Sequence, residues 1–132
     1  MPVMSIISCK IMQDEIVWLL TNDSEINKII IVENENISEF TEKLDEQHTA
    51  YEITSFEKIP NVLEKYDGNK FIVIVNLLKL GLHAVPKILK SEVYQRIREM
   101  IPFSNGILIF YGLCGNVLGN VEEDFCLEKE DR

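Results

Sequence analysis

Two cysteines and one histidine occupy positions in this sequence where they could bind a metal ion. Cys9 ends an apolar run near the N-terminus, His83 follows a longer apolar run, and Cys114 follows a third run in "ILIFYGLCGN". Thiolate and imidazole donors together suit zinc or another transition metal. If the three runs are neighbouring parallel strands, about 4.8 Å apart, side chains at their ends can converge on one ion or small ligand. We therefore expect Cys9, His83 and Cys114 to form a metal site.

Two other interpretations of the same residues remain open. An isolated cysteine behaves as a small hydrophobic residue and is often buried, so each thiol taken alone favours a packing role. Cys114 could instead be a nucleophile, because a thiol at the amino end of a following helix becomes more acidic, with His83 as its base. The sequence assigns no third residue that would orient the histidine.

Glycines on both sides of Cys114 add a possible ligand contact. Gly112 and Gly115 allow positive φ or a close approach of the backbone to a ligand, and exposed amides there could hold an anion, although a tight turn after a strand explains them equally well. The order of the glycines matches neither a phosphate-binding loop nor a dinucleotide fingerprint. Asn116 lies beside these glycines, and Asn76 follows the apolar run 71–75. We therefore assign the ligand-binding role to Gly112, Gly115, Asn116 and Asn76.

Short apolar runs alternate with helical patterns along the chain. The sequence predicts strands within 2–9, 27–36, 50–54, 70–78 and 104–112, and helices within 13–22, 37–48, 55–69 and 86–101. Residues 71–75 are apolar without interruption, which is typical of a strand covered on both faces, so we expect this strand at the centre of the sheet. Trp18, in the first helix, is interpreted as a packing residue.

This alternation predicts an α/β fold, a Rossmann-like three-layer sandwich with a mainly parallel sheet of about five strands. Ligands of such sheets bind beyond the carboxyl ends of the strands, where the three soft donors fall. We expect one domain over residues 1–121 and an acidic C-terminal tail over 122–132. The carboxylates of Glu33 and Glu35, after the second strand, are interpreted as part of a solvated face.

Composition excludes several classes of partner. A net charge of −9 without a basic cluster argues against nucleic acid, and no apolar run is long enough to span a membrane. The first residues lack the pattern of a secretory signal, so we expect a cytoplasmic protein. Three widely spaced cysteines do not form a disulfide framework, which favours reduced thiols.

The segments "ISC", "LLKLGLHAVPKILKSEVYQRI" and "ILIFYGLCGN" resemble an uncharacterised family catalogued as domain of unknown function 1638. Cys9, His83, Cys114 and Gly115 match its motif positions. The resemblance implies that this chain is a truncated form of a longer domain, and that Cys126 is a poor substitute for a missing ligand. It also implies a loose association with one-carbon or corrinoid methyl transfer.

Three functions follow from these observations. The first is a cytoplasmic domain that binds a metal ion or small molecule at the carboxyl edge of the sheet. The second is a thiol-dependent enzyme. The third is a non-catalytic interaction protein, a homodimer formed through an exposed strand of a truncated sheet.

Overall fold

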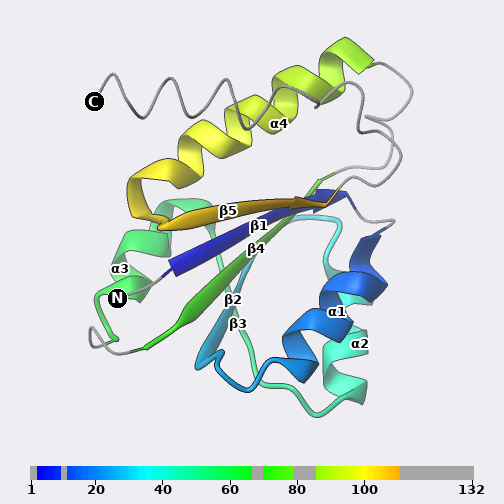
Figure 1. The fold of residues 1–132 in the computed structure, drawn as a ribbon, viewed down its shortest axis with the longest axis vertical. Coiled ribbons are helices and arrows are strands. Elements are labelled where there is room, and N and C mark those ends of the chain that lie inside the picture. The colour runs from blue at the N-terminus through cyan, green and yellow to red at the C-terminus, as the bar shows by residue number, and fades with distance from the viewer. Residues whose placement is uncertain (1–2, 10–11, 67–69, 79–85, 111–132) are drawn as a thin grey trace.

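Five parallel strands form one sheet, and helices cover both of its faces (Figure 1). The computed structural model of the 132-residue chain describes residues 3–9, 12–66, 70–78 and 86–110. The strands are β1 (Val3–Cys9), β2 (Lys28–Val32), β3 (Glu52–Thr54), β4 (Ile72–Leu78) and β5 (Gly106–Phe110). The helices are α1 (Gln13–Asn22), α2 (Ser38–Glu46), α3 (Ile59–Leu63) and α4 (Pro86–Met100), and two short 3-10 helices are η2 (Phe56–Lys58) and η4 (Ile101–Phe103).

The strand order is β3-β2-β4-β1-β5. Every neighbouring pair is parallel, which confirms the predicted α/β, Rossmann-like architecture. β4 lies in the middle of the sheet, as its unbroken apolar run predicts, and all seven of its residues are buried. At the carboxyl edge Cys9 of β1 lies opposite Leu78 of β4, and Ser8 lies opposite Phe110 of β5.

Each face of the sheet has its own apolar core, because side chains alternate between the faces of a strand. One core joins the sheet to α1 and α2, and its members from β4 are Val73, Val75 and Leu77. The other joins the sheet to α3 and α4, and it includes Ile74 and Leu78. Asn76, between them, has the position in the alternation that faces α3 and α4.

The connections after β2 and β4 diverge to opposite faces of the sheet. β2 is followed by α2, whereas β4, its neighbour, is followed by α4 on the other face (Figure 1). Such a divergence defines a topological switch point, the place where open α/β sheets leave a crevice for ligands. The order of the strands therefore locates a candidate site between the carboxyl ends of β2 and β4.

Two local expectations differ from the structure. The helix expected within 55–69 is a 3-10 turn followed by the five residues of α3, with Pro60 in the first turn. The packing role expected for Trp18 is wrong, because 67% of this residue is exposed while α1 buries Ile16, Val17 and Leu20. No described helix is long and apolar enough to cross a membrane.

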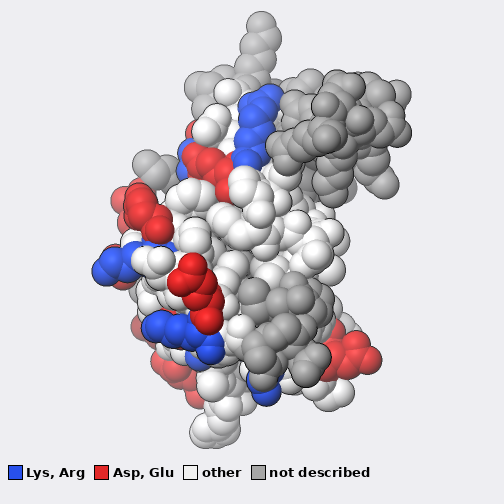
Figure 2. Space-filling model, turned by 90° about the vertical axis from the view of Figure 1, so that its left-hand side faces the viewer, with Lys and Arg blue, Asp and Glu red and all other residues white. Residues whose placement is uncertain are grey.

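Acidic and basic side chains are mixed on the face of the molecule shown in Figure 2. Lys28 pairs with Glu52 at 3.5 Å, and Lys43 pairs with Asp14 at 2.9 Å. The visible described part of that face has no continuous basic patch, so it offers no surface of the kind that binds a phosphate backbone.

Candidate functional site

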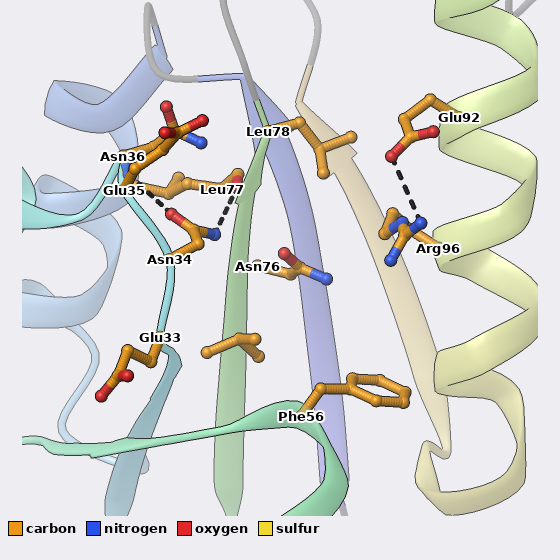
Figure 3. Close-up of a pocket in the computed structure, with 11 residues that line it drawn as sticks. Glu33, Asn34, Glu35, Asn36, Phe56, Asn76, Leu77, Leu78, Glu92 and Arg96 are labelled. Atoms are coloured by element: carbon orange, nitrogen blue, oxygen red, sulfur yellow. Dashed lines mark hydrogen bonds and ion pairs between the residues drawn. The ribbon is translucent and has the colours of Figure 1, made fainter.

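A pocket of about 560 Å³ lies at the switch point between β2 and β4 (Figure 3). Its walls come from the carboxyl ends of both strands, from the segment after β2, from Phe56 of η2 and from one side of α4. The lining residues are Val32, Glu33, Asn34, Glu35, Asn36, Phe56, Asn76, Leu77, Leu78, Glu92 and Arg96.

Asn34 holds the segment after β2 in place. Its Nδ2 donates a hydrogen bond to the carbonyl oxygen of Leu77 at 2.9 Å, and its Oδ1 accepts one from the amide of Asn36 at 2.7 Å. The second bond closes an Asx turn, a local structure that asparagine favours after a strand. Because one side chain bonds both its own turn and β4, this wall of the pocket is fixed to the sheet.

Asn76 presents an unused amide to the pocket. Only 4% of this residue is exposed, and its side chain lies between β4 and α4 (Figure 3). Among the described residues this amide makes no hydrogen bond. Buried amides are nearly always paired, because leaving one without a partner is unfavourable by about 1–3 kcal/mol. Asn76 is thus a hydrogen-bonding group that is ready for a ligand.

Arg96 has its charge neutralised by two carboxylates on its own helix. Its guanidinium lies 3.2 Å from Glu92 and 2.8 Å from Glu99, at the i,i+4 and i,i+3 spacings that bring helical side chains together. Its Nε is buried and has no hydrogen-bond partner among the residues that the structure describes. The described lining residues carry three carboxylates, those of Glu33, Glu35 and Glu92, and one guanidinium, so the formal charge of this described lining is −2.

Cys9 ends β1 as predicted, and it is 1% exposed within the apolar core shared with α3 and α4. This surrounding agrees with the packing interpretation of the thiol. Among the described residues no group of three or more His, Cys, Asp or Glu side chains could hold a metal ion. Apart from Cys9 and Asn76, the predicted site residues lie outside the described ranges: His83, Gly112, Cys114, Gly115 and Asn116.

The strands that precede the three predicted metal ligands are consecutive neighbours in the sheet. Cys9 ends β1, which lies between β4 and β5. In the sequence His83 follows the last residue of β4 by five positions, and Cys114 follows the last residue of β5 by four. The backbone therefore meets the topological condition that the metal prediction requires.

The fold and the pocket together define an α/β domain with an all-parallel, Rossmann-like sheet and a crevice at its switch point. A family model described as "Protein of unknown function (DUF1638)" matches residues 77–130, which confirms the predicted resemblance over that part of the chain. The matched part includes His83 and Cys114, whereas Cys9 precedes it. No curated protein and no solved structure matches the chain.

Most of the pocket is absent from the sequence-based prediction. Asn76 is the one predicted ligand-binding residue that the structure places in its lining. Glu33 and Glu35 are exposed, as expected for a solvated face, but they also line the pocket. One feature of the pocket has a signal in the sequence. Arg96 has a glutamate four residues before it and another three residues after it, and on a helix these spacings predict ion pairs.

Proposed function

We propose that this protein is a binding domain for a metal ion or small ligand at the carboxyl edge of its sheet, with Cys9, His83 and Cys114 as the metal donors. The observation that supports this most directly is the adjacency of β4, β1 and β5. Neighbouring strands lie about 4.8 Å apart, so segments that leave three consecutive strands start within reach of one ion.

The burial of Cys9 is compatible with this role. A thiolate in apolar surroundings needs a compensating cation, which a bound metal ion supplies. Two sulfur donors and one imidazole leave a fourth position of a tetrahedral zinc site for water or a ligand. Zinc is therefore the metal we expect, and another transition metal with similar preferences is the alternative.

Metal analysis of protein purified without a tag and without added zinc tests this proposal. We expect close to one equivalent of metal per chain, measured by mass spectrometry of the elements. Cys114→Ser and His83→Asn should lose most of it, since removing a direct ligand should cost more than the roughly 10–100-fold in affinity that loss of an outer-shell partner costs.

The chain supplies matched controls for both variants. Cys126→Ser changes a thiol whose surroundings do not match the motif. His48→Asn changes a histidine with φ 56°, a conformation that asparagine tolerates. Both controls should keep their metal. A folded, metal-free wild-type protein would contradict the proposal, as would equal losses in the controls.

The outer strands of the sheet favour a second candidate function, that of a homodimer. In the described part of the chain β5 is an outer strand, and Leu108 on it is 38% exposed. An exposed outer strand offers unpaired backbone groups to another chain, and a second copy can pair with β5 about a two-fold axis. This strand has five residues, whereas β3 at the opposite edge has three.

Light scattering coupled to gel filtration distinguishes a dimer from a monomer. We expect a mass twice the 15.3 kDa of one chain, and Leu108→Lys should return it to that of one chain because an outer-strand lysine opposes pairing. The control is Ile53→Lys on β3, where the native residue is 41% exposed. A monomer at every concentration, or dissociation by the control variant instead, contradicts this candidate.

A further inference from the structure

We propose that the pocket between β2, β4 and α4 binds an uncharged nucleoside-like molecule, with a planar hydrogen-bonding ring and hydroxyl groups, and that it discriminates against the phosphorylated form. This inference does not rest on the metal proposal, because its residues are different. It rests on three features: the buried amide of Asn76, which makes no hydrogen bond among the described residues, the carboxylates on the rim, and the arginine paired with two glutamates.

The amide of Asn76 indicates the first half of the ligand. A side-chain amide offers two N–H donors and one carbonyl acceptor in a plane, which matches a group that carries a donor beside an acceptor, such as the edge of a nucleobase. Asn76 lines the pocket, and only 4% of this residue is exposed. A bound ring would therefore satisfy a polar group that the described residues leave without a partner.

Phe56 gives this ring an apolar neighbour. Its side chain lies on the same side of the sheet as Asn76 in Figure 3, and the centroid of its ring is 6.0 Å from that of the Phe103 ring. Val32 and Leu78 complete an apolar part of the lining. A planar heterocycle gains from contact with an aromatic ring, whatever the identity of the base.

The carboxylates of Glu33 and Glu35 indicate the second part of the ligand, the one that carries hydroxyl groups. Both follow β2 and are exposed at the pocket, where they can accept hydrogen bonds from hydroxyl groups. In dinucleotide-binding sheets an acidic residue at such a place binds the ribose hydroxyls. A pocket of about 560 Å³ also lies within the roughly 300–1,000 Å³ typical of small-molecule sites.

The same charges disfavour a phosphate. The described residues of the lining have a formal charge of −2, and the one cation among them, Arg96, already pairs with Glu92 and Glu99. A phosphate near this rim would meet like charge from Glu33 and Glu35, and because both carboxylates are exposed, this repulsion should be greatest at low ionic strength. The sequence also lacks the glycine fingerprint that would supply backbone amides to a phosphate.

Calorimetric titration with adenosine, guanosine, cytidine and uridine, and with their 5′-monophosphates, tests the inference on the full chain. We expect at least one nucleoside to bind with a dissociation constant below about 1 mM, and its monophosphate to bind at least about tenfold more weakly. Asn76→Leu should weaken nucleoside binding by about tenfold or more, as expected for loss of a two-point contact. The matched control is Asn61→Leu, the same change at an exposed position of α3 outside the pocket.

A second variant avoids the core of the protein. Glu33→Gln combined with Glu35→Gln changes two exposed residues and removes the net charge of the described lining, so the fold should persist. The preference for the nucleoside over its monophosphate should then shrink. The inference is overturned if no nucleoside binds, if the monophosphates bind as tightly as the nucleosides, or if Asn76→Leu binds like the control. Repeating the titration after chelation separates this result from the metal proposal, because nucleoside binding should survive the loss of metal.

Discussion

Asn34→Leu should lower the free energy of unfolding by about 1–3 kcal/mol, whereas Asn76→Leu should leave it unchanged or raise it. Asn34 follows β2, Asn76 lies near the end of the neighbouring strand β4, and both line the same pocket. Their side-chain amides differ in the hydrogen bonds that they make. Asn34 bonds to Leu77 and to Asn36, so its removal leaves backbone groups without partners. Asn76 makes no side-chain hydrogen bond among the described residues, so replacing it with leucine breaks no hydrogen bond to those residues.

Urea denaturation of the two variants, followed by circular dichroism, gives both values under identical conditions. Their opposite behaviour would identify Asn34 as a structural residue and Asn76 as one whose partner is not part of the fold. If Asn76→Leu were as destabilising as Asn34→Leu, the amide of Asn76 would have a structural role, and the nucleoside inference would lose its main support.

Phe40→Ala should have the largest effect on stability, a loss of about 3–5 kcal/mol. Phe40 is fully buried where α2 meets the sheet, in the core that includes Ile31 and Val75. Because a domain of this size is stable by only about 5–15 kcal/mol, this single change should bring it close to unfolding. The lost ring would leave a cavity that the surrounding side chains fill only in part.

Trp18→Ala is the matched aromatic control for this experiment. Trp18 is larger than Phe40, but it is 67% exposed on α1, so its removal should change stability by no more than about 0.5 kcal/mol. Thermal and urea denaturation of both variants measure the contrast. Comparable losses would show that Trp18 packs against other residues in solution, which would contradict its exposed position on α1.

The elements with the strongest periodicity could be predicted from the sequence. The run from Phe71 to Val75 correctly indicated the central strand, and Pro86 correctly marked the start of α4. The stripe expected on α4 is confirmed at Val93, Ile97 and Met100, all of which are buried. These elements agree with prediction because burial on two faces, or on one helical stripe, leaves a distinct pattern in the chain.

The orientation of α1 could not be predicted in the same way. Residues 16–20 are all apolar, so their spacing does not distinguish the buried side from the exposed one. The packing of α1 against α2 and the sheet buries Ile16, Val17 and Leu20 and turns Trp18 outward. Tertiary contacts, which local periodicity does not encode, decided this orientation.

The pocket between β2, β4 and α4 also could not be predicted from local sequence patterns. Asn34, Asn76 and Arg96 belong to the segment after β2, to β4 and to α4, and they come together because β2 lies beside β4. That adjacency depends on the order of the strands, which the alternation of strands and helices leaves open. Asn76 was predicted because it follows the unbroken apolar run 71–75, at the end of the central strand, where a polar side chain could contact a ligand.

The last residue of β4 lies between the two proposed sites. Leu78 lines the pocket on one side, and across the sheet it is paired in register with Cys9. A small displacement of this strand end on occupation of the pocket would be transmitted to the neighbouring thiol. Linkage makes such an influence mutual: a metal ion that altered nucleoside affinity by some factor would have its own affinity altered by the same factor.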